Sequence, residues 1–259
     1  MRVPFQLLSR GENLYGVLHI ANNQKSTPVV VIMCYGLNGD RTEKHRMSVK
    51  FAECCENKKI NVVRFDYANI GITEGDFFFS TFSQRVHNVC DIINFVKGCF
   101  NCKIKIILIG FSDGAKVAIN VNDSVDDIEG IAFWNPIINL EQKKNEIKNL
   151  IQEEKFKIHS DYKKPFKPVL GVGLNIHILK ELHEDKSKSK LDQISTKLFV
   201  FGEKDRFTEN MRKFVNQEIS SEKTVLNIKE AGHLFNNTEF EKQVIKNTVK
   251  WIEDVCYEN

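Results

Sequence analysis

The sequence has 259 residues, of which 42% are hydrophobic and 27% charged, with a formal net charge of +3 at pH 7. This composition is typical of a globular protein and disfavours disorder, a collagen-like repeat or a coiled coil. The near-balanced charge also argues against broad nucleic-acid binding, which needs a dense basic stripe. The longest apolar run, residues 29–35, is far shorter than the roughly 20 residues of a membrane-spanning helix, so no span is expected.

The amino-terminal residues and the cysteines predict a cytoplasmic protein. Residues 1–6 contain a proline and polar residues instead of the apolar stretch of a secretory signal. The seven cysteines are an odd number without the spacing of a disulfide framework. Cys99 and Cys102 form a CxxC motif, but it closes a predicted helix and has no further ligands at matching spacing. We therefore expect neither a redox site nor a metal site.

The predicted elements alternate between strand and helix after an opening hairpin of residues 3–8 and 14–21. Short apolar runs predict six buried strands, over residues 29–34, 62–65, 104–109, 131–134, 198–201 and 225–228. Apolar residues at three- and four-residue spacing predict five helices, over residues 47–54, 86–96, 115–121, 211–214 and 244–255. This order predicts an α/β protein with a mostly parallel eight-stranded sheet and helices on both faces.

Residues 137–190 interrupt the alternation, because no strand is convincing there and helical and loop signals mix. We interpret this segment as a small cap or lid inserted into a single domain whose core comprises residues 1–136 and 191–259. Between Glu141 and Lys190 there are 12 lysines against eight acidic residues. Such a charged run is usually a solvated surface, and the alternative is a basic rim that attracts anionic substrates.

The clearest motif is Gly110-Phe111-Ser112-Asp113-Gly114, which follows an apolar strand and opens a helical pattern. A serine on a sharp turn between strand and helix exposes its hydroxyl above the sheet, and the flanking glycines allow the close backbone approach. The amino end of the following helix favours a developing oxyanion. We therefore expect Ser112 to be a nucleophile.

A serine hydroxyl needs a base, and the base needs an acid that holds its tautomer. Asp205 follows the predicted strand 198–201, and His233 follows the strand 225–228. Both strand ends lie at the sheet edge where open α/β sheets place their sites. The order Ser112, Asp205, His233 is that of a hydrolase with a nucleophile elbow. Glu203 is the alternative acid.

With these motifs the chain resembles the α/β-hydrolase superfamily, and within it the small serine esterases of the cinnamoyl/feruloyl esterase and serine-aminopeptidase-like type, over nearly its full length. Residues 35–41 stand where these relatives carry an HGFxG-like loop, with Tyr35 in place of histidine. Residues 64–75 look like their R-x-D-x-x-G-x-G-x-S-x-G stretch, with Asn69 or Ile70 in place of the first glycine. Asparagine tolerates positive φ, so we expect the turn to survive at Asn69.

The resemblance implies the α/β-hydrolase fold and an oxyanion hole made by the backbone amides of Leu37 and Asp113. Tyr35, Phe77 and Phe78 are candidate substrate contacts, although aromatic clusters more often pack in a core. We interpret Arg64 and Asp66 as structural, since an aspartate suits the amides of a tight loop.

Our leading hypothesis is a serine hydrolase that cleaves a small carboxylic ester through an acyl-enzyme, without metal or organic cofactor. The first alternative is a thioesterase or acyltransferase for acyl groups on coenzyme A or a carrier. The second is a non-catalytic binding protein on a hydrolase scaffold. The acyl group, the leaving group and the oligomeric state are not encoded in these motifs.

Overall fold

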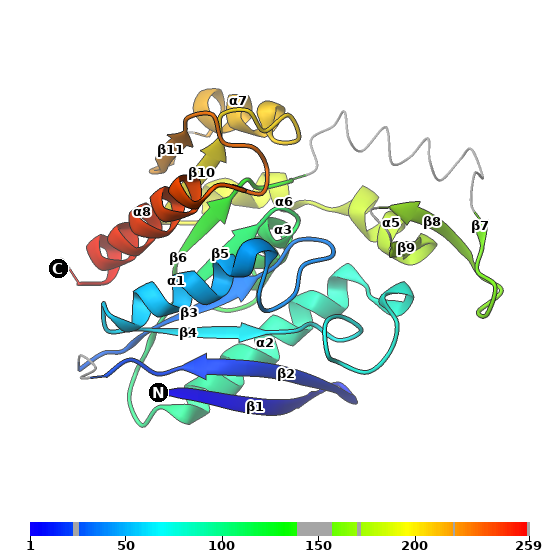
Figure 1. Ribbon diagram of the computed structural model, residues 1–259, viewed down its shortest axis with the longest axis horizontal. Helices are drawn as coiled ribbons and strands as arrows, with labels where there is room; N and C mark the ends of the chain where they lie inside the picture. Colours follow the sequence, from blue (N-terminus) through cyan, green and yellow to red (C-terminus); the bar gives the residue numbers. More distant parts are fainter. Residues whose placement is uncertain (23–25, 139–156, 170–171, 220, 258–259) are drawn as a thin grey trace.

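The computed structural model describes residues 1–22, 26–138, 157–169, 172–219 and 221–257. An eight-stranded sheet with the order β1-β2-β4-β3-β5-β6-β10-β11 runs through it (Figure 1). Its strands are β1 (Arg2–Ser9), β2 (Glu12–His19), β3 (Val29–Cys34), β4 (Ile60–Phe65), β5 (Lys105–Phe111), β6 (Ile128–Trp134), β10 (Lys197–Gly202) and β11 (Thr224–Ile228). The hairpin β1–β2 is antiparallel, β2 pairs antiparallel with β4, and the other pairs are parallel. The predicted mostly parallel eight-stranded sheet is confirmed.

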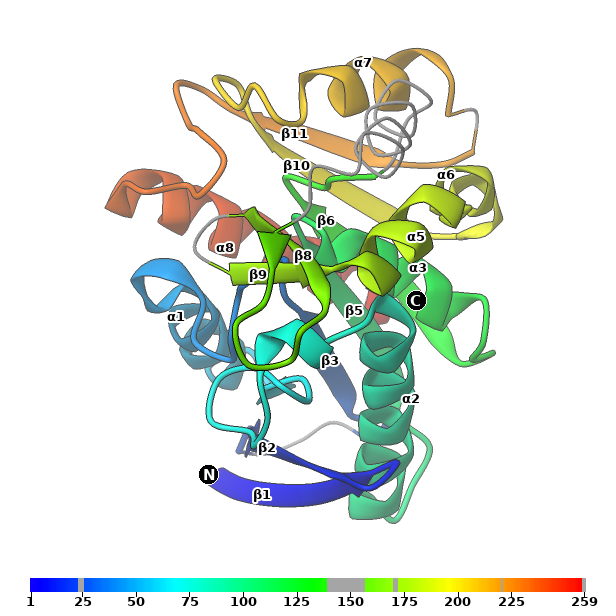
Figure 2. The ribbon, with the colours of Figure 1, turned by 90° about the vertical axis from the view of Figure 1, so that its right-hand side faces the viewer.

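Helices cover both faces of this sheet. On one face lie α1 (Met47–Glu56) and α8 (Thr238–Tyr257), and on the other lie α2 (Phe82–Cys99) and α3 (Gly114–Asn122), as Figure 2 shows. The helix α7 (Glu209–Gln217) joins β10 to β11. The central strands β3 and β4 are buried along their whole length, which explains their continuous apolar and β-branched sequences. The five helices predicted from three- and four-residue spacing are all present.

The register of the parallel strands brings their carboxyl ends to one edge. Cys34 at the end of β3 lies opposite Gly110 in β5, and Phe111 lies opposite Trp134 in β6. On the next strands, Trp134 lies opposite Val200 and Gly202 lies opposite Ile228. The loops after β3, β5, β6, β10 and β11 therefore start side by side, although up to about 200 residues of chain separate them.

Within the predicted insertion, residues 139–156 and 170–171 lie outside the described residues. The rest corrects our expectation that this stretch contains no strand. An antiparallel sheet with the order β7-β8-β9 is formed by β7 (Lys157–Ile158), β8 (Pro165–Val169) and β9 (Val172–Asn175), and α5 (Ile176–Glu184) and α6 (Ser187–Lys190) follow it. This small sheet stands apart from the large one in Figure 1.

The strands of the small sheet escape sequence analysis for physical reasons. They span only two to five residues, and β8 carries Pro165 and Pro168, which have no N–H to donate to a neighbouring strand. Among the described residues, the associated apolar cluster has three buried members, Leu174, Ile178 and Leu179. Too few apolar positions therefore face inward to produce a clear two-residue period.

Candidate active site

Ser112 lies at the turn between β5 and α3, and its backbone adopts φ 55, an uncommon conformation for a residue with a side chain. The turn is fixed by hydrogen bonds from the Ser112 amide to the Trp134 carbonyl (2.9 Å) and from the Ile137 amide to the Ser112 carbonyl (3.0 Å). A Cβ at Gly110 would lie 2.6 Å from the Ala115 Cα atom, so only glycine fits there. This is the local geometry expected of a nucleophile elbow.

His233 connects Ser112 to Asp205. The His233 Nε2 atom lies 3.0 Å from the Ser112 Oγ atom, and its Nδ1 atom lies 2.7 Å from the Asp205 Oδ2 atom. The structure thus brings together three residues from the ends of three strands. Glu203, the alternative acid, instead accepts a hydrogen bond of 3.4 Å from the Glu230 amide.

The hydrogen bonds around Asp205 determine which nitrogen of His233 carries the proton. Asp205 is buried, which by itself raises the pKa of its carboxyl group, but hydrogen bonds from His233, Thr208 and the Phe207 amide outweigh burial and lower that pKa. The ionised carboxylate only accepts, so Nδ1 of His233 must donate to it. In the neutral ring, Nε2 is then free to accept the proton of the Ser112 hydroxyl.

Asn135 holds the histidine loop in place, and our sequence analysis missed it. Its side-chain amide donates to the carbonyl of His233 (2.8 Å) and to that of Gly232 (3.3 Å), while its Oδ1 atom accepts from the Gly202 amide (2.7 Å). It is fully buried and has φ 40. The available signal was its position directly after the β6 strand, at the edge where the other site residues follow their strands.

Leu37 and Asp113, the two residues expected to supply oxyanion-hole amides, line one pocket of about 130 Å³ together with Ser112 and His233. The Leu37 carbonyl accepts from the buried guanidinium of Arg85 on α2 (2.9 Å). The Asp113 carboxylate accepts from Lys116 (2.5 Å), one turn into α3. Both backbone segments are therefore anchored beside the serine.

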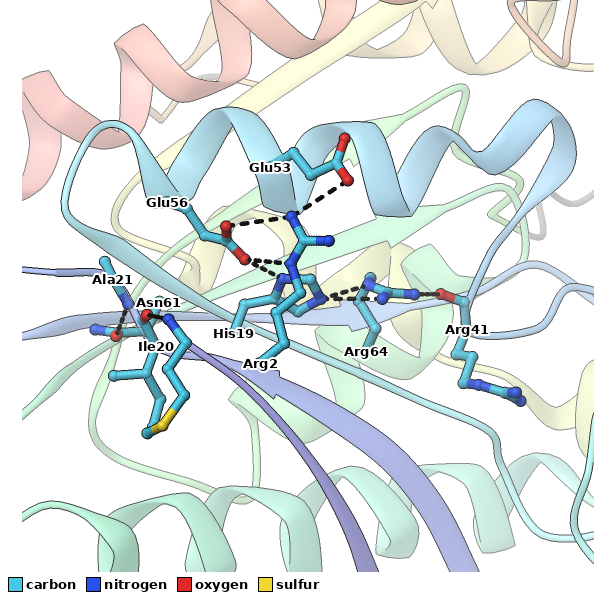
Figure 3. Close-up of polar contacts among 10 residues, drawn as sticks. Arg2, His19, Ile20, Ala21, Arg41, Glu53, Glu56, Asn61 and Arg64 are labelled. Atoms are coloured by element: carbon cyan, nitrogen blue, oxygen red, sulfur yellow. Dashed lines mark hydrogen bonds and ion pairs between the residues drawn. The ribbon is translucent and has the colours of Figure 1, made fainter.

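Arg64 and Asp66 support the loop after β3, as expected for structural residues. Asp66 is fully buried and accepts from the amides of Arg41 (2.7 Å) and Ile72 (3.1 Å) as well as from the Arg41 guanidinium. Arg64 donates to the Arg41 carbonyl (2.7 Å), as Figure 3 shows. Asn69, one of the two residues expected in place of a glycine, adopts φ 65, the positive φ expected of a turn there.

None of the three candidate substrate contacts is among the described residues that line this pocket. Tyr35 is 1% exposed, and its hydroxyl accepts from the Phe65 amide (3.2 Å), which corrects the expectation that it contacts substrate. Phe77 packs with Leu37 against the small apolar cluster under β9. Phe78 is buried against Tyr162 and lines a second cavity, of about 270 Å³. The two phenylalanines thus pack beneath the small sheet.

Comparison with known proteins identifies the fold of the chain. No family model and no curated protein matches the sequence. Among solved structures, Est1E from Butyrivibrio proteoclasticus with ferulic acid bound matches with a TM-score of 0.78 at 14% identity, over 96% of this chain and 98% of that one. The alpha/beta hydrolase GrgF from Penicillium sp. sh18 matches with a TM-score of 0.72 at 16% identity, over 98% of each chain. The esterase domain of a Rhodothermus marinus protein matches with a TM-score of 0.70 at 14% identity, over 97% of this chain and 98% of that one.

The chain has the α/β-hydrolase fold. Within this α/β-hydrolase fold, Ser112, Asp205 and His233 occupy loops at the carboxyl edge of the parallel strands, where open α/β sheets place ligands. No group of three or more potential metal ligands occurs in the described part of the chain. Among the same residues, none of the helices combines the length and the apolarity needed to cross a bilayer.

Proposed function

We propose that this protein is a serine hydrolase that cleaves carboxylic esters through an acyl-enzyme. One observation carries the proposal: the unbroken hydrogen-bonded series from the Ser112 hydroxyl through His233 to a buried carboxylate, at the wall of a pocket. A nucleophile, a base and an orienting acid in this arrangement are the requirements of acyl transfer.

In the proposed reaction the Ser112 Oγ atom attacks the ester carbonyl while Nε2 of His233 takes its proton. Asp205 stabilises the resulting imidazolium, and the amides of Leu37 and Asp113 donate to the oxyanion. The imidazolium then protonates the leaving alcohol, which leaves the acyl group on Ser112. Water, deprotonated by His233, releases the acid and restores the serine. Every proton in this cycle moves between chain, substrate and water, so no cofactor is required.

The decisive experiment compares wild type with Ser112→Ala on a p-nitrophenyl ester and with a fluorophosphonate probe. We expect labelling of Ser112 in the wild type and a loss of kcat on the order of 10⁴ or more in the variant. Ser48→Ala is the matched control, since its buried hydroxyl has no hydrogen-bond partner among the described residues. An unchanged rate in Ser112→Ala contradicts the mechanism. Absence of labelling in folded wild type favours the non-catalytic binding protein.

A second candidate, thioester hydrolysis or acyl transfer from coenzyme A or an acyl carrier, is favoured by the charge of the small sheet. Between positions 157 and 167 there are four lysines and one acidic residue, Asp161; the lysines are Lys157, Lys163, Lys164 and Lys167. We interpret residues 137–190 as a cap whose basic hairpin steers anionic substrates. Steering predicts that kcat/KM for an acyl-CoA falls with rising salt while that for a neutral ester does not. Equal salt dependence argues for the simple esterase.

A further inference from the structure

Glu43 lies in the loop between β3 and α1 and lines the same pocket as Ser112 and His233. One of its carboxylate oxygens accepts a long hydrogen bond of 3.4 Å from the Gly36 amide. The carboxylate also lies directly over Gly39, where a Cβ atom would collide with it. The glycine at position 39 thus leaves room for an acidic group in the pocket.

The backbone at Glu43 is strained. Its φ of 54 and ψ of 172 fall in a region that is essentially restricted to glycine, and His45 and Arg46 follow with φ 56 and 59. Residues in such conformations cluster at binding and catalytic sites, where the surrounding structure imposes them. Glycine would occupy position 43 with less strain, so a glutamate there points to a role for its carboxyl group.

The charges around Glu43 are unbalanced. Burial raises the pKa of its carboxyl group to about 7. Hydrogen bonds from the backbone amides of Gly36 and Lys44 lower this pKa, but by less than burial raises it. The titratable and charged groups that face it are the phenol of Tyr35, Asp40 and Lys44 from its own loop, and Asp113 and His233 across the pocket.

No basic side chain of the described residues forms an ion pair with Glu43. The Arg41 guanidinium is paired with Asp66 and the Lys116 ammonium with Asp113. The Lys44 side chain is exposed and has the weakest of the named effects on Glu43. A carboxylate that is partly shielded from water and has no cationic partner is stabilised by a ligand that supplies one.

We propose that Glu43 determines specificity by binding a positively charged group, a substituted ammonium, in the alcohol part of the ester. We assign the ammonium group to the alcohol part because His233 must protonate the leaving oxygen of the alcohol. The alcohol therefore lies beside His233, in the pocket that Glu43 also lines. The inference rests on the proposed ester hydrolysis and adds a substrate class to it. The preferred substrates are esters of amino alcohols.

The test uses two esters of one acyl group, the choline ester and its neutral isostere, the 3,3-dimethylbutyl ester. In wild type the ratio of their kcat/KM values is expected to be about tenfold at pH 8, the attraction of a partly buried ion pair. The ratio falls toward one at pH 6, because Glu43 is then protonated. Changes that affect the hydrolysis of both esters equally cancel in the ratio.

The variant Glu43→Gln keeps the size and the hydrogen-bond acceptor of the side chain but lacks the charge. We expect its ratio to be near one at both pH values, while the control Glu253→Gln, on α8, keeps the wild-type ratio. A merely structural role for Glu43 changes the two rates together and leaves the ratio intact. Equal rates in wild type at pH 8, or a preference that survives in Glu43→Gln, overturn the proposal.

A binding measurement separates this proposal from the proposed function. Choline is titrated by calorimetry into Ser112→Ala, which requires no turnover. We expect Ser112→Ala to bind choline at pH 8 and to bind it about tenfold more weakly at pH 6. We expect Ser112→Ala/Glu43→Gln not to bind choline. Where wild type hydrolyses neither ester, the proposed esterase fails and this arm decides the role of Glu43. If the single and the double variant then bind choline with equal affinity, or if neither binds it, the proposed role of Glu43 is overturned.

Discussion

Two histidines in the part of the chain that the structure describes have a carboxylate at Nδ1, and they differ in what lies at Nε2. His233 has Asp205 at 2.7 Å and the Ser112 hydroxyl at 3.0 Å. His19 has Glu56 at 2.5 Å and the Arg64 guanidinium at 2.9 and 3.1 Å (Figure 3). A guanidinium only donates, so Nε2 of His19 must accept from it and Nδ1 carries the proton.

The surroundings of the two rings differ as well. The His233 side chain is 16% exposed and lines the pocket, whereas that of His19 is fully buried between β2, β4 and α1. Burial lowers the pKa of His19, and this effect outweighs the hydrogen bond that His19 donates to Glu56, which raises it. A histidine with a carboxylate partner therefore becomes a candidate base only where its second nitrogen faces a nucleophile that substrate can reach.

The largest expected contrast between the two sites follows removal of the imidazoles. His233→Ala is expected to lower kcat on the order of 10⁵-fold, because Ser112 loses its base. His19→Ala is expected to change kcat less than tenfold but to lower the free energy of unfolding by about 3 kcal/mol, since Arg64 and Glu56 lose a buried partner. Ester kinetics and urea denaturation of each variant measure the two effects. Similar losses of kcat in both folded variants contradict the contrast.

The carboxylates provide the next contrast. Asp205→Asn is expected to lower kcat on the order of 10⁴-fold, because an amide no longer requires the proton on Nδ1 of His233. Glu56→Gln alters the other histidine in the same way, and we expect it to reduce kcat less than tenfold. The two variants are compared on one p-nitrophenyl ester after circular dichroism has verified folding. A milder effect of Asp205→Asn than of Glu56→Gln refutes the assignment of Asp205.

The smallest effect concerns pH. Because the pKa of His19 is lower in the folded than in the unfolded chain, the unfolded chain binds more protons as pH falls below about 6.5. The free energy of unfolding therefore declines from pH 7.5 to 5.5, and part of this decline is missing in His19→Gln. Urea denaturation of wild type and variant across this range measures the difference. Parallel pH curves show that His19 does not titrate as inferred.

Sequence reasoning worked best where structure is determined locally. The strand before Ser112, the glycines around it and the helix after it lie within some 20 residues, and all are present. Six of the eight strands of the large sheet were predicted from short continuous apolar runs, which burial on both faces favours, and the other two were predicted as the opening hairpin. The small sheet was missed because β8 contains Pro165 and Pro168 and its strands bury few side chains.

Other features depend on contacts between distant segments. Asn135 orients the His233 loop across about 100 residues of chain, and no local pattern marks an asparagine for that role. Tyr35 was expected to contact substrate from its place in the loop after β3, yet its ring packs against Tyr67 in the core. Glu43 becomes noticeable only through its strained backbone and its place in the pocket.

The sequence by itself determined the alternating architecture and the tight turn that carries Ser112, because strand burial and this turn are set by neighbouring residues. Only the tertiary structure decided that Asp205, and not Glu203, contacts His233, and that Glu43 enters the pocket beside Ser112. The register of parallel strands joins residues more than 100 positions apart, and short-range patterns carry no information about such distances.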